Sequence, residues 1–251
     1  MTGPRRKTEE QGASRRRAAP FRCRLVVMAK TPVAGAVKTR LAREVGVAEA
    51  TRFARHAGAA LLGRIGFDPR WRTILAVAPD ADVTGRCWSP RVSRIPQGGG
   101  DLGTRMQRIF DRVPPGPVLI VGTDVPGITP QHIAQAFRLL GRHDAVFGPA
   151  ADGGYWLVGS KRRPSVLPIF TGVRWSSPHA LADTLANLRG RSVGFVATLS
   201  DVDDASGMAL TAAHFGRRIL PHHLQRMKGP RSRWKWSRWA SLCSGPSTTR
   251  K

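Results

Sequence analysis

Six apolar runs of strand length constrain the fold of this 251-residue chain more than any other feature. Each run is apolar throughout instead of alternating with polar residues, which is the pattern of strands that are buried on both faces of a sheet. Stretches with helical spacing separate several of the runs. The expected strands are residues 24–29, 73–78, 118–122, 145–148, 155–159 and 193–199.

Helical patterns between the runs complete an α/β arrangement. Apolar residues recur at steps of three and four, and Pro, Ser and Gly stand where helices start and stop. A mostly parallel sheet covered by helices on both faces follows from this alternation. The expected helices are residues 47–65 and residues 130–140, the second opened by Pro130 and stopped by Gly141. A third helix is expected to have Ser177 as its cap and Pro178 as its first helical position, and to continue through residues 180–188.

The formal net charge of +25 is concentrated at the two ends of the chain. Residues 1–24 carry eight Lys or Arg against two Glu, and residues 216–251 carry ten against no acid. We expect a single α/β domain over residues 24–220, with disordered basic tails over residues 1–23 and 221–251, the second containing Trp. Basic and indole groups in these tails suit contact with nucleic acid or an anionic membrane, and a solvated extension without a partner is the alternative.

Cysteine usage and hydropathy predict a cytoplasmic protein. Cys23, Cys87 and Cys243 are odd in number and widely spaced, which supports neither a disulfide framework nor a structural zinc site. No apolar run approaches the roughly 18 to 20 residues that span a bilayer. The histidines lack metal-ligand spacing, and the chain has no G-x-S-x-G elbow, so a hydrolase triad has no support.

A basic loop follows the first expected strand. Within residues 29–41, Lys30, Gly35, Lys38 and Arg40 are candidates for binding a di- or triphosphate, because cations and backbone N–H groups share its negative charge. The loop is not a Walker A motif, since its lysine follows Val instead of Gly. A solvated basic surface is the alternative.

Carboxylates follow two further strands. Asp124 comes after the run 118–122, where it can hold Mg²⁺ or Mn²⁺, or cap a turn. Asp152 precedes Gly153 and Gly154, which let a ligand approach the backbone closely or form a plain hairpin turn. Ligands bind outside the carboxyl ends of the strands in such sheets, so these residues can converge on one edge.

Three more acids follow the last run. Asp201, Asp203 and Asp204 would repel one another unless a cation or a basic neighbour lies nearby, and a helix N-terminus is the alternative for the last two.

A glycine-rich turn leads into another helical pattern. Gln97, Gly98, Gly99 and Asp101 belong to it, and a turn so poor in side chains suits contact with a nucleoside. Gln97 or Asp101 would hydrogen-bond the base or ribose. A mobile linker is the alternative.

Four of these blocks together resemble a family of GT-A-like transferases described as arsenosugar-biosynthesis-type glycosyltransferases. The resemblance spans about residues 24 to 212 and implies a three-layer α/β/α, Rossmann-like nucleotide-diphospho-sugar transferase (GT-A) fold. It places Asp124 as the metal-binding acid of a D-x-D motif. Only one acid stands there, which implies a second metal contact from Asp152 or Asp203. The blocks are residues 29–41, 97–103, 122–126 and 148–155.

One late segment departs from that family. The relatives read Asp-x-Asp-Thr-Pro where this chain reads Asp-Val-Asp-Asp-Ala from Asp201 onward, which leaves Asp204 without an assigned role.

The resemblance implies a metal-dependent glycosyltransferase that moves a sugar from a nucleotide sugar to a small acceptor, with Asp152 as the general base. The basic loop and the Asp124 block are also similar to phospholactate guanylyltransferases, which implies the alternative of a nucleotidyltransferase joining a nucleoside triphosphate to a phosphorylated acceptor. A basic binding protein that has kept the fold and lost catalysis is the third hypothesis.

Overall fold

A seven-stranded sheet forms the centre of residues 22–163 and 165–202, which are the residues that the computed structural model describes. The strand order is β3-β2-β1-β4-β6-β5-β7, and β6 alone runs antiparallel to its neighbours β4 and β5. The mostly parallel α/β sheet expected from the sequence is thus confirmed. The strands are β1 (Arg24–Lys30), β2 (Arg72–Ala78), β3 (Ser93–Pro96), β4 (Val118–Gly122), β5 (Ala145–Pro149), β6 (Tyr155–Ser160) and β7 (Val193–Phe195).

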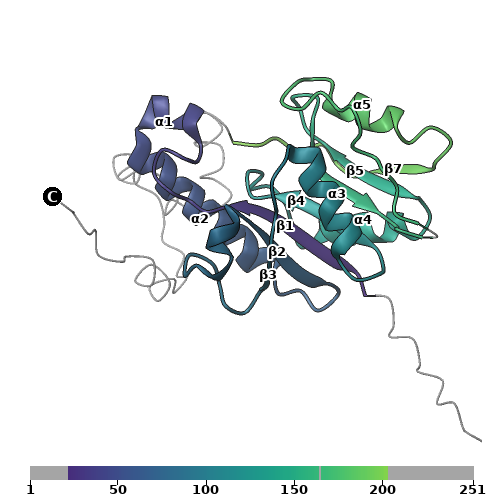
Figure 1. Cartoon of the computed structure of the whole chain (residues 1–251), viewed down its shortest axis with the longest axis horizontal. Helices are drawn as coiled ribbons and strands as arrows, with labels where there is room; N and C mark the ends of the chain where they lie inside the picture. The colour runs from purple at the N-terminus through teal and green to yellow at the C-terminus, as the bar shows by residue number, and fades with distance from the viewer. Residues whose placement is uncertain (1–21, 164, 203–251) are drawn as a thin grey trace, which may run out of the picture.

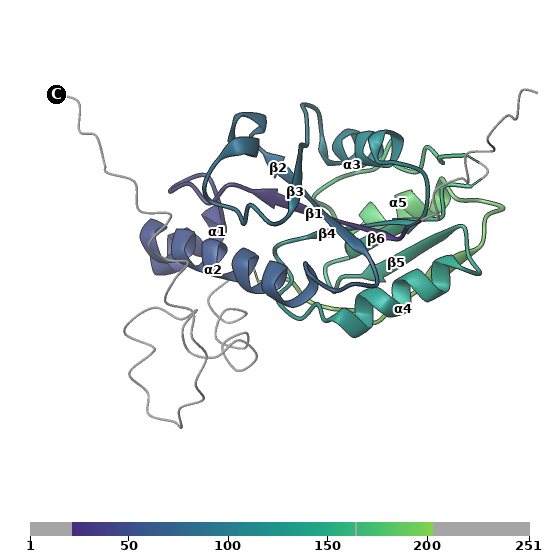
Figure 2. The same ribbon diagram turned by 90° about the horizontal axis from the view of Figure 1, so that it is seen from below.

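Helices cover both faces of the sheet, which makes three layers (Figure 2). On one face lie α2 (Val47–Ile65) and α4 (Pro130–Leu140), and on the other lie α3 (Leu102–Arg112) and α5 (Ala180–Ala186). Val27 joins the first core and Val26 the second, because successive side chains of a strand point to opposite faces. Burial on both faces is why the strands read as unbroken apolar runs.

The strand order reverses beside β1. The chain leaves β1 through α1 (Thr39–Val45) and α2 toward β2 and β3, then returns along the opposite face through α3 to β4, on the other side of β1 (Figure 1). Such a topological switch point opens a crevice outside the carboxyl ends of the two strands. The loops that follow β1 and β4 therefore meet there.

Two of the predicted helices are confirmed with their expected bounds, and the third is shorter. α5 begins at Ala180 after His179, so the prediction that Ser177 caps it and Pro178 opens it was wrong. The Ser177 hydroxyl instead donates to the Arg174 carbonyl oxygen and accepts from the His179 amide. Ser177 is thus committed to the turn before the helix.

The two edges of the sheet also differ from the prediction. β3 was missed because its four residues, Ser-Arg-Ile-Pro, contain no apolar run and lie at an edge. The predicted strand over residues 193–199 is regular only as far as Phe195. Beyond it, Val196 and Leu199 still donate their amides to the carbonyl oxygens of Phe147 and Pro149, so the segment follows β5 where the β5–β6 register is irregular.

None of the helices in the described part of the chain is both long and apolar enough to cross a bilayer. The predicted tails, residues 1–23 and 221–251, lie outside the described residues apart from Arg22 and Cys23. Their contacts stay predictions.

Candidate functional site

An ion pair joins the loops that follow β1 and β4. The Lys38 Nζ lies 3.1 Å from the Asp124 Oδ1. These two strands are adjacent and parallel, with Met28 opposite Gly122, so both loops leave from the same edge of the sheet. The predicted phosphate-binding lysine and the predicted metal-binding acid are therefore brought together at the switch point.

The two partners differ in their exposure to solvent. The Lys38 side chain is only 7% exposed, whereas the Asp124 side chain is 61% exposed. Lys38 precedes α1 in the left-handed conformation, with φ of 49°. Its ammonium thus reaches the carboxylate from within the protein, while solvent reaches the carboxylate from outside.

The late acidic segment arrives at the same place. The Val202 amide donates to the Asp124 carbonyl oxygen at 3.1 Å. The Val202 side chain is buried in a small apolar cluster with Leu41 and Phe53 of α1 and α2. Packing thus fixes the segment beside the Asp124 loop and brings Asp201 into that region. Asp203 lies outside the described residues, so its metal role stays a prediction.

Asp152 lies in the hairpin turn between β5 and β6, at the same edge. Its Oδ1 accepts from the Gly154 amide at 2.9 Å, and the Ala150 amide donates to the Gly154 carbonyl oxygen. The hairpin interpretation of the Asp-Gly pair is confirmed, while the role of Asp152 as a base stays a prediction. Burial raises the pKa of the neighbouring Tyr155 hydroxyl, so this hydroxyl stays protonated at neutral pH and does not serve as the base.

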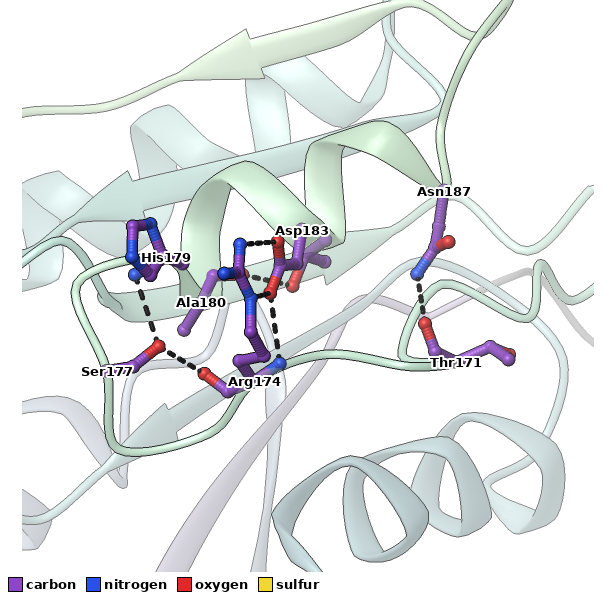
Figure 3. A network of polar contacts seen from close by, with 8 residues as sticks. Thr171, Arg174, Ser177, His179, Ala180, Asp183 and Asn187 are labelled. Carbon is purple, nitrogen blue, oxygen red and sulfur yellow. Dashed lines mark hydrogen bonds and ion pairs between the residues drawn. The ribbon is translucent and has the colours of Figure 1, made fainter.

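A cross-linked loop packs on this turn. Arg174 donates from Nε and Nη2 to the two carboxylate oxygens of Asp183, at 2.9 and 2.8 Å. Figure 3 shows this pair beside the hydrogen bonds of the Ser177 hydroxyl, one of which comes from the His179 amide. At the far end of the loop, the Asn187 side chain donates to the Thr171 carbonyl oxygen. The loop forms one wall next to the Asp152 turn, since its Pro178 backbone packs directly on Gly153. The Leu181 amide of α5 also donates to the Gly153 carbonyl oxygen.

This pair gives a pH-dependent prediction. The Arg174 hydrogen bonds hold the pKa of Asp183 well below its usual range. Because the folded-state pKa is lowered, the pair stabilises the fold above the unfolded pKa of about 3.9, and this stabilisation is lost as the pH falls through the folded-state value. In urea unfolding, the deficit of Asp183→Asn relative to wild type should therefore be largest at pH 7 and should shrink below about pH 4. Asp111→Asn is the control, and an equal deficit for Asp183→Asn at every pH would contradict the prediction.

The glycine-rich turn has a structural anchor at Gln97. This side chain is 5% exposed, and its Nε2 donates to the carbonyl oxygens of Ala29 and Ala76 at the ends of β1 and β2. Asp101 caps α3 by accepting from the Thr104 amide at 2.8 Å. Hydrogen bonds from the Thr104 side chain and then from this amide lower the Asp101 pKa. Gln97 positions the turn in this structure, whereas Asp101 keeps an exposed carboxylate at the start of α3.

Arginines of α3 bind the backbone of the rest of the turn, a role that was not predicted from the sequence. Arg108 donates to the carbonyl oxygens of Gln97 and Gly99, at 2.7 and 2.9 Å, and Arg105 donates to that of Gly100. In a trans peptide the N–H points opposite to the C=O. Because the arginines draw these carbonyl oxygens toward α3, the N–H group of the residue after each carbonyl points away from α3. The sequence signal for this role was the presence of two arginines, Arg105 and Arg108, about one and two helical turns after the glycines.

A groove of about 450 Å³ continues from this turn along α3. It shares Arg108 with the turn, and Gln107, Arg112 and Phe170 also line it. Lys38, Asp124 and Asp152 are not among its lining residues, so the groove and the ion pair are separate features.

The described residues fit a metal ion that arrives with a nucleotide. Among them, no group of three or more His, Cys, Asp and Glu forms a complete protein cage. Mg²⁺ is usually bound by one or two carboxylates together with phosphates and water, so Asp124 is sufficient as a protein ligand. In this structure the Asp124 carboxylate pairs with a cationic group, the Lys38 ammonium, and its side chain is 61% exposed.

Comparison with known proteins agrees with this fold. Residues 61–177 match the model of a family described as "Uncharacterized protein conserved in bacteria (DUF2064)". A crystal structure described as a "putative nucleotide-diphospho-sugar transferase from Desulfovibrio desulfuricans G20" is 28% identical, with a TM-score of 0.69 over 79% of this chain and 88% of that chain. A search of curated proteins found no match.

A second solved structure shows the fold alone. The 4-diphosphocytidyl-2C-methyl-D-erythritol synthase of Anaerococcus prevotii DSM 20548 is 11% identical, with a TM-score of 0.52 over 77% of this chain and 96% of that chain. The expected nucleotide-diphospho-sugar transferase fold is confirmed. The similarity to the Desulfovibrio structure identifies the chain as a transferase-like enzyme.

Proposed function

We propose that this chain is a metal-dependent glycosyltransferase that moves a sugar from a nucleotide-sugar donor to a small acceptor. The observation that carries the proposal is the Lys38–Asp124 pair at the switch point, where a cation and an accessible carboxylate lie side by side. The similarity to the Desulfovibrio structure supports a nucleotide sugar as the donor.

In this proposal the basic loop binds the donor diphosphate. Lys30, Lys38 and Arg40 neutralise its charge in the ground state and, more strongly, as the leaving group gains charge. Mg²⁺ or Mn²⁺ at Asp124, with Asp203 as a further ligand, would supply additional charge stabilisation when bound.

The nucleoside and the acceptor use the other two motifs. The backbone of Gly98 and Gly99, together with Asp101, contacts the base or ribose. Gly35 and Gly154 allow close approach of the ligand, and Gly153 supports this binding by forming the turn on which the Pro178 loop packs. Asp152 accepts the proton of the acceptor hydroxyl as the new glycosidic bond forms and the bond from sugar to diphosphate breaks.

Nucleotidyl transfer is the second candidate, because the Anaerococcus synthase shares this fold. The same cations would then bind a triphosphate, an acceptor phosphate would attack the α-phosphorus, and pyrophosphate would leave. Fold alone does not separate the two reactions.

Ligand-dependent stability and the identity of the product test both candidates. We expect a UDP-, GDP-, ADP- or TDP-sugar with Mn²⁺ to stabilise the chain by about 2.7 kcal/mol at 100 times its dissociation constant. Turnover should release a nucleoside diphosphate. Stabilisation by a single nucleoside triphosphate, with release of pyrophosphate, would replace this proposal with nucleotidyl transfer. If none of these ligands stabilises the chain, the remaining hypothesis is a basic binding protein without catalytic activity.

A further inference from the structure

The burial of the Lys38 side chain is the starting point. A buried ammonium is costly unless it has a partner of opposite charge, and the Asp124 carboxylate lies 3.1 Å from it. The left-handed backbone of Lys38 at the start of α1 directs this arrangement, and non-glycine residues adopt that conformation rarely. The protein thus maintains an unusual local geometry at the lysine that meets Asp124.

The loop that carries Asp124 is fixed on both sides. The Val202 amide holds the Asp124 carbonyl oxygen, and Arg64 of α2 donates to the carbonyl oxygens of Pro126 and Ile128, at 2.6 and 2.9 Å. Val125 is buried directly after the acid. The backbone at Asp124 is thus held in place, so the pair can open only through movement of its side chains.

We infer that Lys38 is a positioning residue that holds the place of the metal ion on Asp124 until a nucleotide binds. The inference rests on the proposed function. The carboxylate that pairs with the ammonium is exposed, so a divalent cation that approaches from solvent competes with Lys38 for the same oxygens. A nucleotide diphosphate offers Lys38 a second anion, which draws the ammonium off Asp124 as the metal ion enters.

Metal and nucleotide therefore bind cooperatively. The nucleotide draws the Lys38 ammonium off Asp124 and so raises the affinity for the metal ion. The metal ion in turn raises the affinity for the nucleotide by the same factor, because such coupling is reciprocal by thermodynamic necessity. Metal alone binds weakly, and the metal–nucleotide complex is the form that the site accepts.

Mn²⁺ binding to the full chain, followed by the electron paramagnetic resonance signal of free Mn²⁺, tests this inference without any turnover. Without nucleotide, Lys38→Met should bind Mn²⁺ about tenfold more tightly than wild type, because one competing charge is removed from a carboxylate that solvent reaches. Lys38→Arg keeps the charge and should behave as wild type. Arg43→Gln removes an equal charge from exposed α1 surface and controls for net charge.

Addition of UDP or GDP gives the second arm. Either nucleotide should tighten Mn²⁺ binding in wild type and should do so less in Lys38→Met, which has already lost the competitor. Unchanged or weaker nucleotide-free Mn²⁺ binding in Lys38→Met would overturn the inference. Tighter binding that persists in Lys38→Met/Asp124→Asn would also overturn it, since the added affinity would then arise elsewhere.

Failure of the proposed function is distinguishable from failure of the inference. If Asp124→Asn leaves Mn²⁺ binding unchanged in wild type and in Lys38→Met, with and without nucleotide, then Asp124 is not a metal ligand and both fall. If Asp124-dependent binding with nucleotide is present but Lys38→Met matches wild type without nucleotide, the inference alone falls.

Discussion

Asp124→Asn should remove most of the metal-dependent stabilisation of the chain by its nucleotide. The ligand-free variant should also be less stable than wild type, because the buried Lys38 ammonium loses its charged partner, so the ligand effect is compared within each variant. Asparagine keeps the shape of the side chain but removes the charge that a hard divalent cation requires. The replaced group is 61% exposed, and its neighbour Val125, which is buried, is untouched. If affinity falls about a hundredfold, a ligand that adds about 2.7 kcal/mol to the stability of wild type should add only about 0.4 kcal/mol to the variant.

Urea unfolding with and without the nucleotide and Mn²⁺ measures this difference. Asp111→Asn is the matched control, because Asp111 is an exposed carboxylate of α3 that accepts a hydrogen bond from Gln107 and takes no part in the Lys38–Asp124 pair. The control should keep the full stabilisation. A full ligand effect in Asp124→Asn would remove Asp124 from the metal site and contradict the proposed function.

The fold was predictable from the sequence where burial on both faces determines the residues. β1 and β4 read as unbroken apolar runs, and a Pro at the first turn located α4 correctly. The failures arose where a tertiary contact outweighed a local signal. Ser177 followed by Pro178 has the pattern of a helix start, but the turn is cross-linked by Arg174 and packs on the Asp152 hairpin, which delays the helix to Ala180.

The sequence predicted candidate site residues one by one, but not their arrangement. Lys38 and Asp124 were each chosen for the chemistry of their side chain, yet only the adjacency of β1 and β4 shows that they meet. Gln97 was chosen because it is polar and stands in a glycine-rich turn. Its role of joining the ends of β1 and β2 depends on the β-sheet, which no local pattern encodes. The part played by Arg108 depends in the same way on the packing of α3.

Gly153→Ala should destabilise the chain strongly, because the turn at Asp152 and the loop that packs on it leave no room for a side chain. Gly153 has φ of +85°, and an added Cβ would overlap the carbonyl oxygen of Pro178. The left-handed conformation costs an alanine about 1–2 kcal/mol, and overpacking adds about 1–3 kcal/mol, so we expect a loss of about 2–5 kcal/mol in the free energy of unfolding.

Gly172→Ala isolates the contribution of the contact from that of the conformation. Gly172 also has a positive φ, of +67°, but an added Cβ would meet no atom within 4 Å. It should therefore lose only the conformational part, about 1–2 kcal/mol, in the same urea unfolding experiment. Equal losses in the two variants would mean that the loop over Asp152 moves aside at no cost, and the wall assigned to it would then not be rigid. A larger loss at Gly153 supports a preformed wall beside the proposed base.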